Sequence, residues 1–271
     1  MKKIYSYKDK NQIWRILISN TEKLVLETRN VNTKEVFYHC FRLETGKKIF
    51  SGLQLDEKYW LGIEAVYNDI IFFHRFPKPD LPRHKEIIAF DINTQKVLWS
   101  NKETAFLFIY ENKVYGFIQG FEERFFYAYE LLTGVLTEEL GTDFGTINKL
   151  KSLAEKQYDW ELYIYPEIFH KGEPAANIEK LIIEQTNDLD IVGEVEYNIY
   201  QNILFYNYHT RFADDTYVNK FLAVDIYTGK KLLSEVLNKE AKSLFTDSFF
   251  VFKDFLFLLK EKNEIEVYRL S

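Results

Sequence analysis

The sequence lacks the features that mark secreted and membrane-spanning proteins. Its 271 residues include a single cysteine, Cys40, so no disulfide can form within the chain. No apolar run approaches the roughly 20 residues that a membrane-spanning helix needs. The segment 1–10 begins with positive charge, but no apolar stretch follows it as in a signal peptide. We therefore expect a cytoplasmic protein without a membrane partner, in which Cys40 is a small buried strand residue.

The sequence also lacks a surplus of basic charge and any short catalytic motif. Lysine and arginine number 35 against 41 aspartates and glutamates, and the net charge is −6. No basic stripe of the kind that neutralises phosphates is present, so we expect no nucleic-acid partner. A nucleophile elbow, a phosphate-binding loop and a zinc-finger pattern are all missing. We accordingly expect neither a cofactor nor a metal ion, and nothing here indicates catalysis.

Glycine and proline are scarce, whereas aromatic residues are abundant. There are 11 glycines and 5 prolines, which argues against a collagen-like or disordered chain. The 24 phenylalanines, 19 tyrosines and 4 tryptophans are typical of sheets, because aromatic side chains fill pleated, half-buried surfaces well. The length suits one large all-β domain as well as two smaller domains. Composition therefore favours an all-β fold.

A short segment recurs along the chain, in which an apolar strand ends in a polar turn. Copies occupy 40–50, 89–99, 128–134 and 223–232. Three of the turns contain Thr-Gly, at 45–46, 133–134 and 228–229. Glycine supplies the positive φ of a tight turn, and the threonine hydroxyl can bond to nearby backbone. Each copy therefore predicts two strands joined by a hairpin turn.

A second segment precedes the first and completes a repeating unit. It consists of two apolar strands around a short polar turn, with copies at 17–25, 65–73, 108–115, 199–206 and 251–257. Together the segments predict a four-stranded meander, A–B–C–D. The equivalent C-strand positions are Arg42, Asp91, Glu130, Asp225 and Arg269, with one degenerate unit expected between Glu130 and Asp225 and its C strand at 181–187. A spacing of about 40 to 50 residues matches the blade of a β-propeller.

The two ends of the sequence complement each other. Residues 267–271 match 40–44 and stop at the turn, while residues 2–5 match 47–50. We therefore predict that residues 2–5 lie beside 265–270 and cover an otherwise open sheet edge. The predicted fold is a single all-β domain over 1–271, a β-propeller of about six four-stranded blades whose last blade is closed by the N-terminal strand. Five or seven blades remain open alternatives.

Two stretches depart from the strand pattern. Apolar residues recur at helical spacing over 147–156 and 232–244. We interpret both as strands that run into short helical or irregular connections between blades. A purely helical interpretation would interrupt the repeat.

The pattern Ala-x-Asp-x-x-Thr-Gly-x-x-x-Trp resembles the tryptophan-docking repeat of quinoprotein (PQQ-like) propellers and, more loosely, WD40-like repeats. Residues 89–99 match it except for Gln95 at the glycine position, and 223–233 match it except for Leu233 at the tryptophan position. The resemblance implies a propeller without implying a function, because propellers host unrelated activities. The quinoprotein dehydrogenases of this kind carry a vicinal cysteine pair. With Cys40 alone, the chain looks like an uncharacterised member without that cofactor.

The B–C loops are the candidate binding site. In such a meander, the B–C and D–A connections open on one face and the A–B and C–D turns on the other. The loops expected at 75–84, 170–177 and 210–216 are polar, and the prolines and most histidines gather around them. Proline stiffens a loop, and loops on a rigid scaffold concentrate function. The candidate ligand- or partner-binding residues are His74, Arg75, Asp80, His84, His170, His209, Arg211, Asp214 and Asp215.

These features favour a non-catalytic binding or interaction scaffold, which takes an unknown protein or small ligand at the B–C loop face. The alternative is a hydrolase or lyase acting on a sugar or peptide at the channel mouth. It would use Asp80, His84, His209 and Asp214, since acid–base catalysis needs such groups within hydrogen-bond reach of a substrate. No spacing motif joins the loop residues into a ligand set, so no metal is expected.

Overall fold

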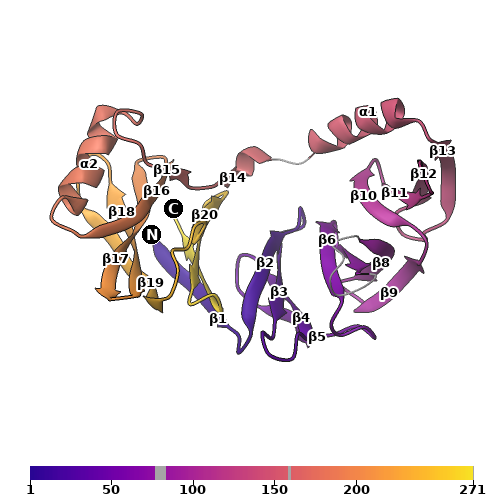
Figure 1. Cartoon of the computed structure of the whole chain (residues 1–271), viewed down its shortest axis with the longest axis horizontal. Helices are drawn as coiled ribbons and strands as arrows, with labels where there is room; N and C mark the ends of the chain where they lie inside the picture. The colour runs from indigo at the N-terminus through magenta and orange to yellow at the C-terminus, as the bar shows by residue number, and fades with distance from the viewer. Residues whose placement is uncertain (77–83, 158–159, 271) are drawn as a thin grey trace. The chain divides into compact units, whose positions relative to one another are not determined.

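The chain is all-β, with antiparallel sheets and two α-helices among the residues that the computed structural model describes, 1–76, 84–157 and 160–270 (Figure 1). Its internal contacts divide it into two compact units, Lys10–Asp159 on one hand and Met1–Asp9 with Trp160–Ser271 on the other. The single domain expected over 1–271 stays a prediction. In the described part, neither helix is long and apolar enough to cross a bilayer.

The unit Lys10–Asp159 contains three four-stranded meanders, each with its strands in sequence order. The first sheet consists of β2 (Gln12–Ile18), β3 (Lys23–Arg29), β4 (Val36–Arg42) and β5 (Lys48–Leu53). The second consists of β6 (Leu61–Tyr67), β7 (Ile70–Arg75), β8 (Lys85–Asp91) and β9 (Lys96–Asn101). The third consists of β10 (Ala105–Tyr110), β11 (Lys113–Gln119), β12 (Arg124–Glu130) and β13 (Leu136–Gly141). The A–B–C–D meander predicted from the repeat is confirmed in these three sheets.

The unit formed by Met1–Asp9 and Trp160–Ser271 contains two five-stranded sheets. One has the order β15 (Glu167–Ile168), β16 (Ile191–Tyr200), β17 (Ile203–Ala213), β18 (Thr216–Asp225) and β19 (Lys231–Ala241). The other, called the terminal sheet below, has the order β1 (Lys2–Lys8), β22 (Glu264–Arg269), β21 (Phe255–Lys260), β20 (Phe249–Phe252) and β14 (Tyr163–Ile164). A 3₁₀ turn, Trp160–Leu162, precedes β14.

The terminal sheet confirms the predicted pairing of the two chain ends. β1 pairs antiparallel with β22, with Lys2 opposite Arg269 and Lys3 opposite Tyr268. Lys3 Nζ lies 2.5 Å from a carboxylate oxygen of the buried Glu266. The N-terminal strand therefore covers the edge that β22 would otherwise expose.

The predicted strand at 181–187 is wrong, because these residues belong to helix α2 (Ala176–Thr186) except for the last, its C-cap. Ile178 and Ile182 are one helical turn apart and pack against Leu204 and Tyr206 of β17. An apolar run of this length fits both a strand and a helix, and here the apolar face of the sheet selects the helix. The described residues therefore form five sheets, and the sixth unit expected from the repeat is not among them.

The other stretches with helical spacing have different outcomes. Helix α1 (Phe144–Glu155) occupies most of 147–156, and Asp143 caps its first turn by accepting a hydrogen bond from Thr146 N at 3.0 Å. The helix packs through Ile147 and Ala154 against Phe126 of the third sheet. Residues 232–244 are strand as far as Ala241, so the strand interpretation was the right one there.

The C–D turns have the conformation predicted from their sequence. Asp225 Oδ1 accepts hydrogen bonds from Tyr227 N at 3.1 Å and Thr228 N at 2.8 Å. The carboxylates of Asp91 and Glu130 accept the same pair of backbone bonds in their own turns. The residue after the threonine has positive φ in each turn, including the glutamine that replaces glycine: Gly46, Gln95, Gly134 and Gly229.

Trp99 joins the second sheet to the third. Its indole N–H donates a 2.9 Å hydrogen bond to the carbonyl of Leu131, and its ring lies on Gly134. A Cβ atom at Gly134 would lie only 2.5 Å from Trp99 Cδ2, and φ there is +68°. Glycine is therefore required at position 134 both by the turn and by the indole that covers it.

The core lies mainly between neighbouring sheets. Val25 and Tyr38 of the first sheet pack with Phe73 and Phe90 of the second. In the other unit, Phe221 of β18 packs with side chains of the terminal sheet. Cys40 is fully buried in β4, as expected, and burial raises the pKa of its thiol to about 12.

Candidate functional site

A group of titratable side chains gathers where β6 begins, β7 ends and β8 starts. His74 lies on β7, and His84 immediately precedes β8. Glu64 lies on β6 at an irregularity in the pairing, since Ile63 and Ala65 are opposite consecutive residues of β7. Such a bulge redirects a side chain, and here Glu64 reaches the side on which His74 lies. We refer to these three residues as the Glu64 cluster.

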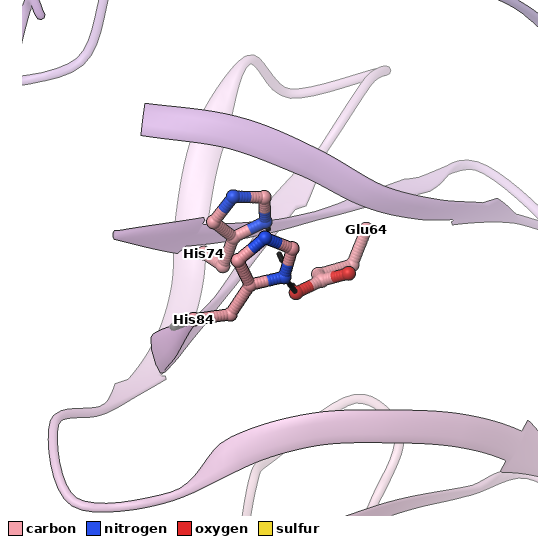
Figure 2. Close-up of side chains that lie close together, drawn as sticks. All are labelled: Glu64, His74 and His84. Atoms are coloured by element: carbon pink, nitrogen blue, oxygen red, sulfur yellow. Dashed lines mark hydrogen bonds and ion pairs between the residues drawn. The ribbon is translucent and has the colours of Figure 1, made fainter. Parts of the chain in front are cut away.

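One carboxylate oxygen lies close to both histidines of the Glu64 cluster and is hydrogen-bonded to His84. Glu64 Oε1 lies 2.6 Å from Nδ1 of His84 and 3.0 Å from Nδ1 of His74. The two imidazoles are stacked, with ring centroids 3.6 Å apart and planes 7° from parallel. Figure 2 shows the two rings one above the other, with the same edge turned to Glu64. One carboxylate oxygen and two imidazole nitrogens therefore lie within 4.8 Å of one another.

Solvent reaches this cluster from the side of His84. The side chain of His74 is 1% exposed, that of Glu64 is 15% exposed and that of His84 is 34% exposed. Phe76 presents its ring edge-on to both imidazoles, with centroids 4.6 Å from His74 and 5.2 Å from His84. Behind His74, Gly62 leaves room for the ring, because a Cβ atom there would lie 2.7 Å from His74 Cε1. The site is therefore enclosed on one side and open on the other.

The charges within the cluster follow from burial and proximity. Burial raises the pKa of Glu64, but the neighbouring His74 and His84 outweigh this, so the pKa of that carboxyl lies below its ordinary value. Burial lowers the pKa of His74 by more than Glu64 raises it. At neutral pH the cluster therefore contains an ionised carboxylate beside a neutral, buried imidazole.

The first sheet fixes the backbone of this site. Glu27 Oε2 accepts a 3.2 Å hydrogen bond from Ile63 N, and Arg15 donates to Ile63 O. Glu27 is itself fully buried and pairs with Arg29, whose Nε lies 2.7 Å from Glu27 Oε1. The backbone N–H and C=O of Ile63, the residue before Glu64, are thus both hydrogen-bonded to side chains of the first sheet. The position of Glu64 therefore depends on packing between two sheets.

Three of the nine residues expected at the binding face lie together here. His74 and His84 belong to the cluster, and Arg75 Nε lies 2.8 Å from Glu86 Oε2 at the same end of the sheet. Asp80 lies outside the described residues. The remaining five belong to the other unit: His170, His209, Arg211, Asp214 and Asp215.

The loops expected around those five residues differ from the prediction. His170 is exposed and follows β15, so the stretch 170–177 leads into α2 instead of joining strands B and C. Residues 210–213 belong to β17, which leaves only Asp214 and Asp215 as an exposed hairpin turn. Arg211 donates to Asp214 O at 3.3 Å. The 210–216 segment is therefore an extended hairpin, because its residues continue the strand pairing.

His209 belongs to a buried polar group in the β15–β19 sheet. It lies 3.2 Å from Phe245 N, which donates to its Nε2. Asn219, opposite His209 on β18, is fully buried and donates to Ser248 Oγ at 3.1 Å. Glu196 and Asn207 face each other on β16 and β17. His209 is thus a hydrogen-bonded core histidine.

Replacing Glu196 with glutamine is expected to raise the free energy of unfolding by about 1 kcal/mol at neutral pH. Burial raises the pKa of Glu196 despite its hydrogen bonds from Asp247 N and Asn207. The folded chain therefore keeps this proton to higher pH than the unfolded chain, so stability falls as pH rises above the ordinary glutamate range. A glutamine amide can instead donate to Asn207 Oδ1, a buried acceptor without a donor among the described residues.

Urea denaturation of both proteins at about pH 4 and about pH 7 measures this effect. The gain from Glu196→Gln should be larger at the higher pH, since only there does the wild type carry the buried charge. A gain that is the same at both pH values would contradict the assignment.

Sequence reasoning missed Glu64. The available signal was a lone carboxylate within an otherwise apolar segment, 61–67, that precedes a strand ending in histidine. The expectation of no metal rested on the absence of a spacing motif. Side chains that come together from separate strands and loops do not form such a motif, because their separation in sequence is set by the connections between the strands.

Known proteins give little information on function. A model of a family described as a domain of unknown function (DUF4905) matches residues 18–99, which include the Glu64 cluster. No curated protein matches the chain. Among 153 matching chains of solved structures is one from a study of the structure and mechanism of two prolyl endopeptidases. It is 9% identical with a TM-score of 0.39, and the match covers 96% of this chain and 41% of that one. The chain thus spans less than half the length of that protein.

Proposed function

We propose that the chain is a non-catalytic binding protein, built as a cytoplasmic β-propeller, that takes a protein or small ligand beside the Glu64 cluster. The binding face would consist of the ends of β6, β7 and β8 together with the B–C loop 75–84. Nucleic acid and membrane are not among the proposed partners, since the net charge is −6.

The observation that carries this proposal is the contrast between the two ends of the β6–β9 sheet. At the C–D turn, the Asp91 carboxylate is engaged by the backbone N–H groups of its own turn and by Thr94. At the opposite end, Glu64 and the two histidines engage one another, and His84 stays partly exposed. Polar groups that do not serve the backbone and still reach solvent are the usual components of a binding site.

The propeller part of the proposal rests on the repeated sheets and on how they are joined. Antiparallel sheets recur along the chain, and three of them are four-stranded meanders. The second and third of these meanders are linked by Trp99, whose ring lies on Gly134. That contact supports the resemblance to the tryptophan-docking repeat. Pairing of β1 with β22 is what a blade shared by both chain ends requires.

The binding proposal is tested by affinity capture with three forms of the full chain. These are the wild type, a variant in which residues 77–83 are replaced by a short glycine–serine linker, and the control Tyr227→Ser. Tyr227 is 85% exposed at a C–D turn and is not among the residues of the proposed face, so its substitution alters an exposed side chain without changing that face. Proteins or metabolites retained by the wild type and the control but lost from the linker variant support the proposal. Unchanged capture by the linker variant contradicts it.

A hydrolase or lyase is the second candidate, favoured by one observation. His84 is a partly exposed imidazole oriented by a half-buried carboxylate at 2.6 Å, which is how many general bases are held. Turnover of a chromogenic ester, glycoside or peptide that disappears in Glu64→Gln would favour an enzyme over a binding protein. His209 and Asp214, also expected at the channel mouth, belong to the other unit.

A further inference from the structure

We propose that Glu64, His74 and His84 bind a divalent first-row transition-metal ion, of which Zn²⁺ is the representative. This inference stands on the geometry of the cluster and does not depend on the proposed binding function. It also revises the expectation, drawn from sequence spacing, that the chain has no metal site.

The distances within the cluster already approach those of a coordinated ion. One ligand atom from each residue lies within 4.8 Å of the other two, and the nitrogens lie 2.6 and 3.0 Å from Glu64 Oε1. Metal bonds of about 2.0–2.2 Å place neighbouring tetrahedral ligand atoms roughly 3.3–3.6 Å apart. Because an imidazole lone pair lies in the plane of its ring, the stacked rings must also tilt relative to each other for both nitrogens to reach one ion, and the partly exposed His84 is the ring that can turn.

The surroundings of His74 also favour a bound cation. Neither ring nitrogen of His74 makes a well-aligned hydrogen bond to a described residue, although the side chain is 1% exposed. A buried imidazole without such a partner beside a carboxylate gains from a cation that binds both.

The donor set identifies the class of ion. Two imidazole nitrogens with one carboxylate oxygen suit Zn²⁺ and the neighbouring transition metals, whereas Ca²⁺ and Mg²⁺ prefer oxygen alone. Three protein ligands leave one position for water or for a group of a bound molecule. That position would face the solvent side of the site, where His84 is 34% exposed.

Neighbouring residues restrict the positions of these ligands. Glu27 and Arg15 bind the peptide groups of Ile63, so the backbone before Glu64 is fixed independently of any ion. Gly62 gives His74 its place over β6, and Phe76 limits the movement of both rings. Ligand orientation by such neighbours commonly changes metal affinity by about 10- to 100-fold. The backbone around the site is thus fixed without the metal, and a rotation of the His84 side chain would complete the ligand set.

The test is a titration of the full chain, freed of metal by a chelator, with Zn²⁺ alone by calorimetry and with Co²⁺ alone by visible absorption. The variants are Glu64→Gln and His84→Ala, neither of which removes a core side chain. His170→Ala is the matched control, because His170 is exposed and lies in the other unit. Circular dichroism establishes that each variant is folded.

We expect the wild type and His170→Ala to bind one ion per chain, and each cluster variant to bind at least about tenfold more weakly. The Co²⁺ complex should lack a thiolate charge-transfer band, since Cys40 is buried and is not one of the clustered ligand residues. Equal affinity in all four proteins, binding by none of them, or a thiolate band would overturn the proposal. Because the titration uses no protein partner, its failure is distinct from failure of the proposed binding function.

Discussion

Replacing Trp99 with alanine is expected to lower the free energy of unfolding by about 3–5 kcal/mol, as for other buried tryptophans. Trp99 is 9% exposed and packs among Phe72, Ile109 and Leu131 at the junction of two sheets. Its removal leaves a cavity there and deprives the carbonyl of Leu131 of the indole N–H. Both losses act at the same junction, so the second and third sheets should separate more easily.

Urea denaturation followed by circular dichroism measures the loss, with Trp14→Ala as the control. Trp14 is 59% exposed and lies 4.8 Å from the guanidinium of Arg29, so its removal should cost about 1 kcal/mol or less. Gly134→Ala should also destabilise, because its Cβ would strike the indole. Equal losses from Trp99→Ala and Trp14→Ala would show that the contact with Gly134 does not join the sheets.

Replacing Glu27 with alanine is expected to lower the free energy of unfolding by about 3–5 kcal/mol, the usual effect of breaking a buried ion pair. Glu27 is 0% exposed and binds both Arg29, at 2.6 Å, and the backbone N–H of Ile63. Alanine would leave the Arg29 guanidinium without its carboxylate and Ile63 N without an acceptor. It would also free the bulge that positions Glu64, so metal affinity should fall together with stability.

The comparison for this prediction is Glu155→Ala on helix α1. Glu155 is exposed and lies 4.0 Å from Lys151, a surface pair whose loss should cost under about 1 kcal/mol. Chemical denaturation gives the stability of each protein. A loss at Glu27 as small as that at Glu155 would mean that the buried pair contributes little to joining the first and second sheets.

Where local chemistry decides the structure, the sequence was sufficient to predict it. Asp225 and the Thr228–Gly229 pair specify their turn through hydrogen bonds within a few residues, so the turn was predictable. The pairing of residues 2–5 with 265–270 was predictable because each end carries half of a recognisable unit. The helix over 181–186 was not predictable, because an isolated apolar run fits a strand as well as a helix. Packing of Ile178 and Ile182 on another sheet decides that segment.

The same distinction applies to the candidate site. His74 and His84 were predictable, since they flank a polar loop between two apolar strands. Glu64 was not, because its direction depends on a bulge held from the neighbouring sheet by Glu27 and Arg15. The sequence also did not predict that His209 and His84 belong to different compact units. A repeat gives the positions of equivalent residues along the chain, but it does not show which sheets contact each other.

The pairing of β1 with β22 also sets an order of events during synthesis on the ribosome. Residues Lys10–Asp159 can complete their three meanders while the rest of the chain is still being made. Strand β1 has no partner until Glu264–Arg269 emerges, since Lys3 and Glu266 are 263 residues apart. For most of translation this strand is therefore an unpaired edge that any other strand can capture. Aggregation of nascent chains should accordingly depend on residues 2–8 more than on any segment of the completed meanders.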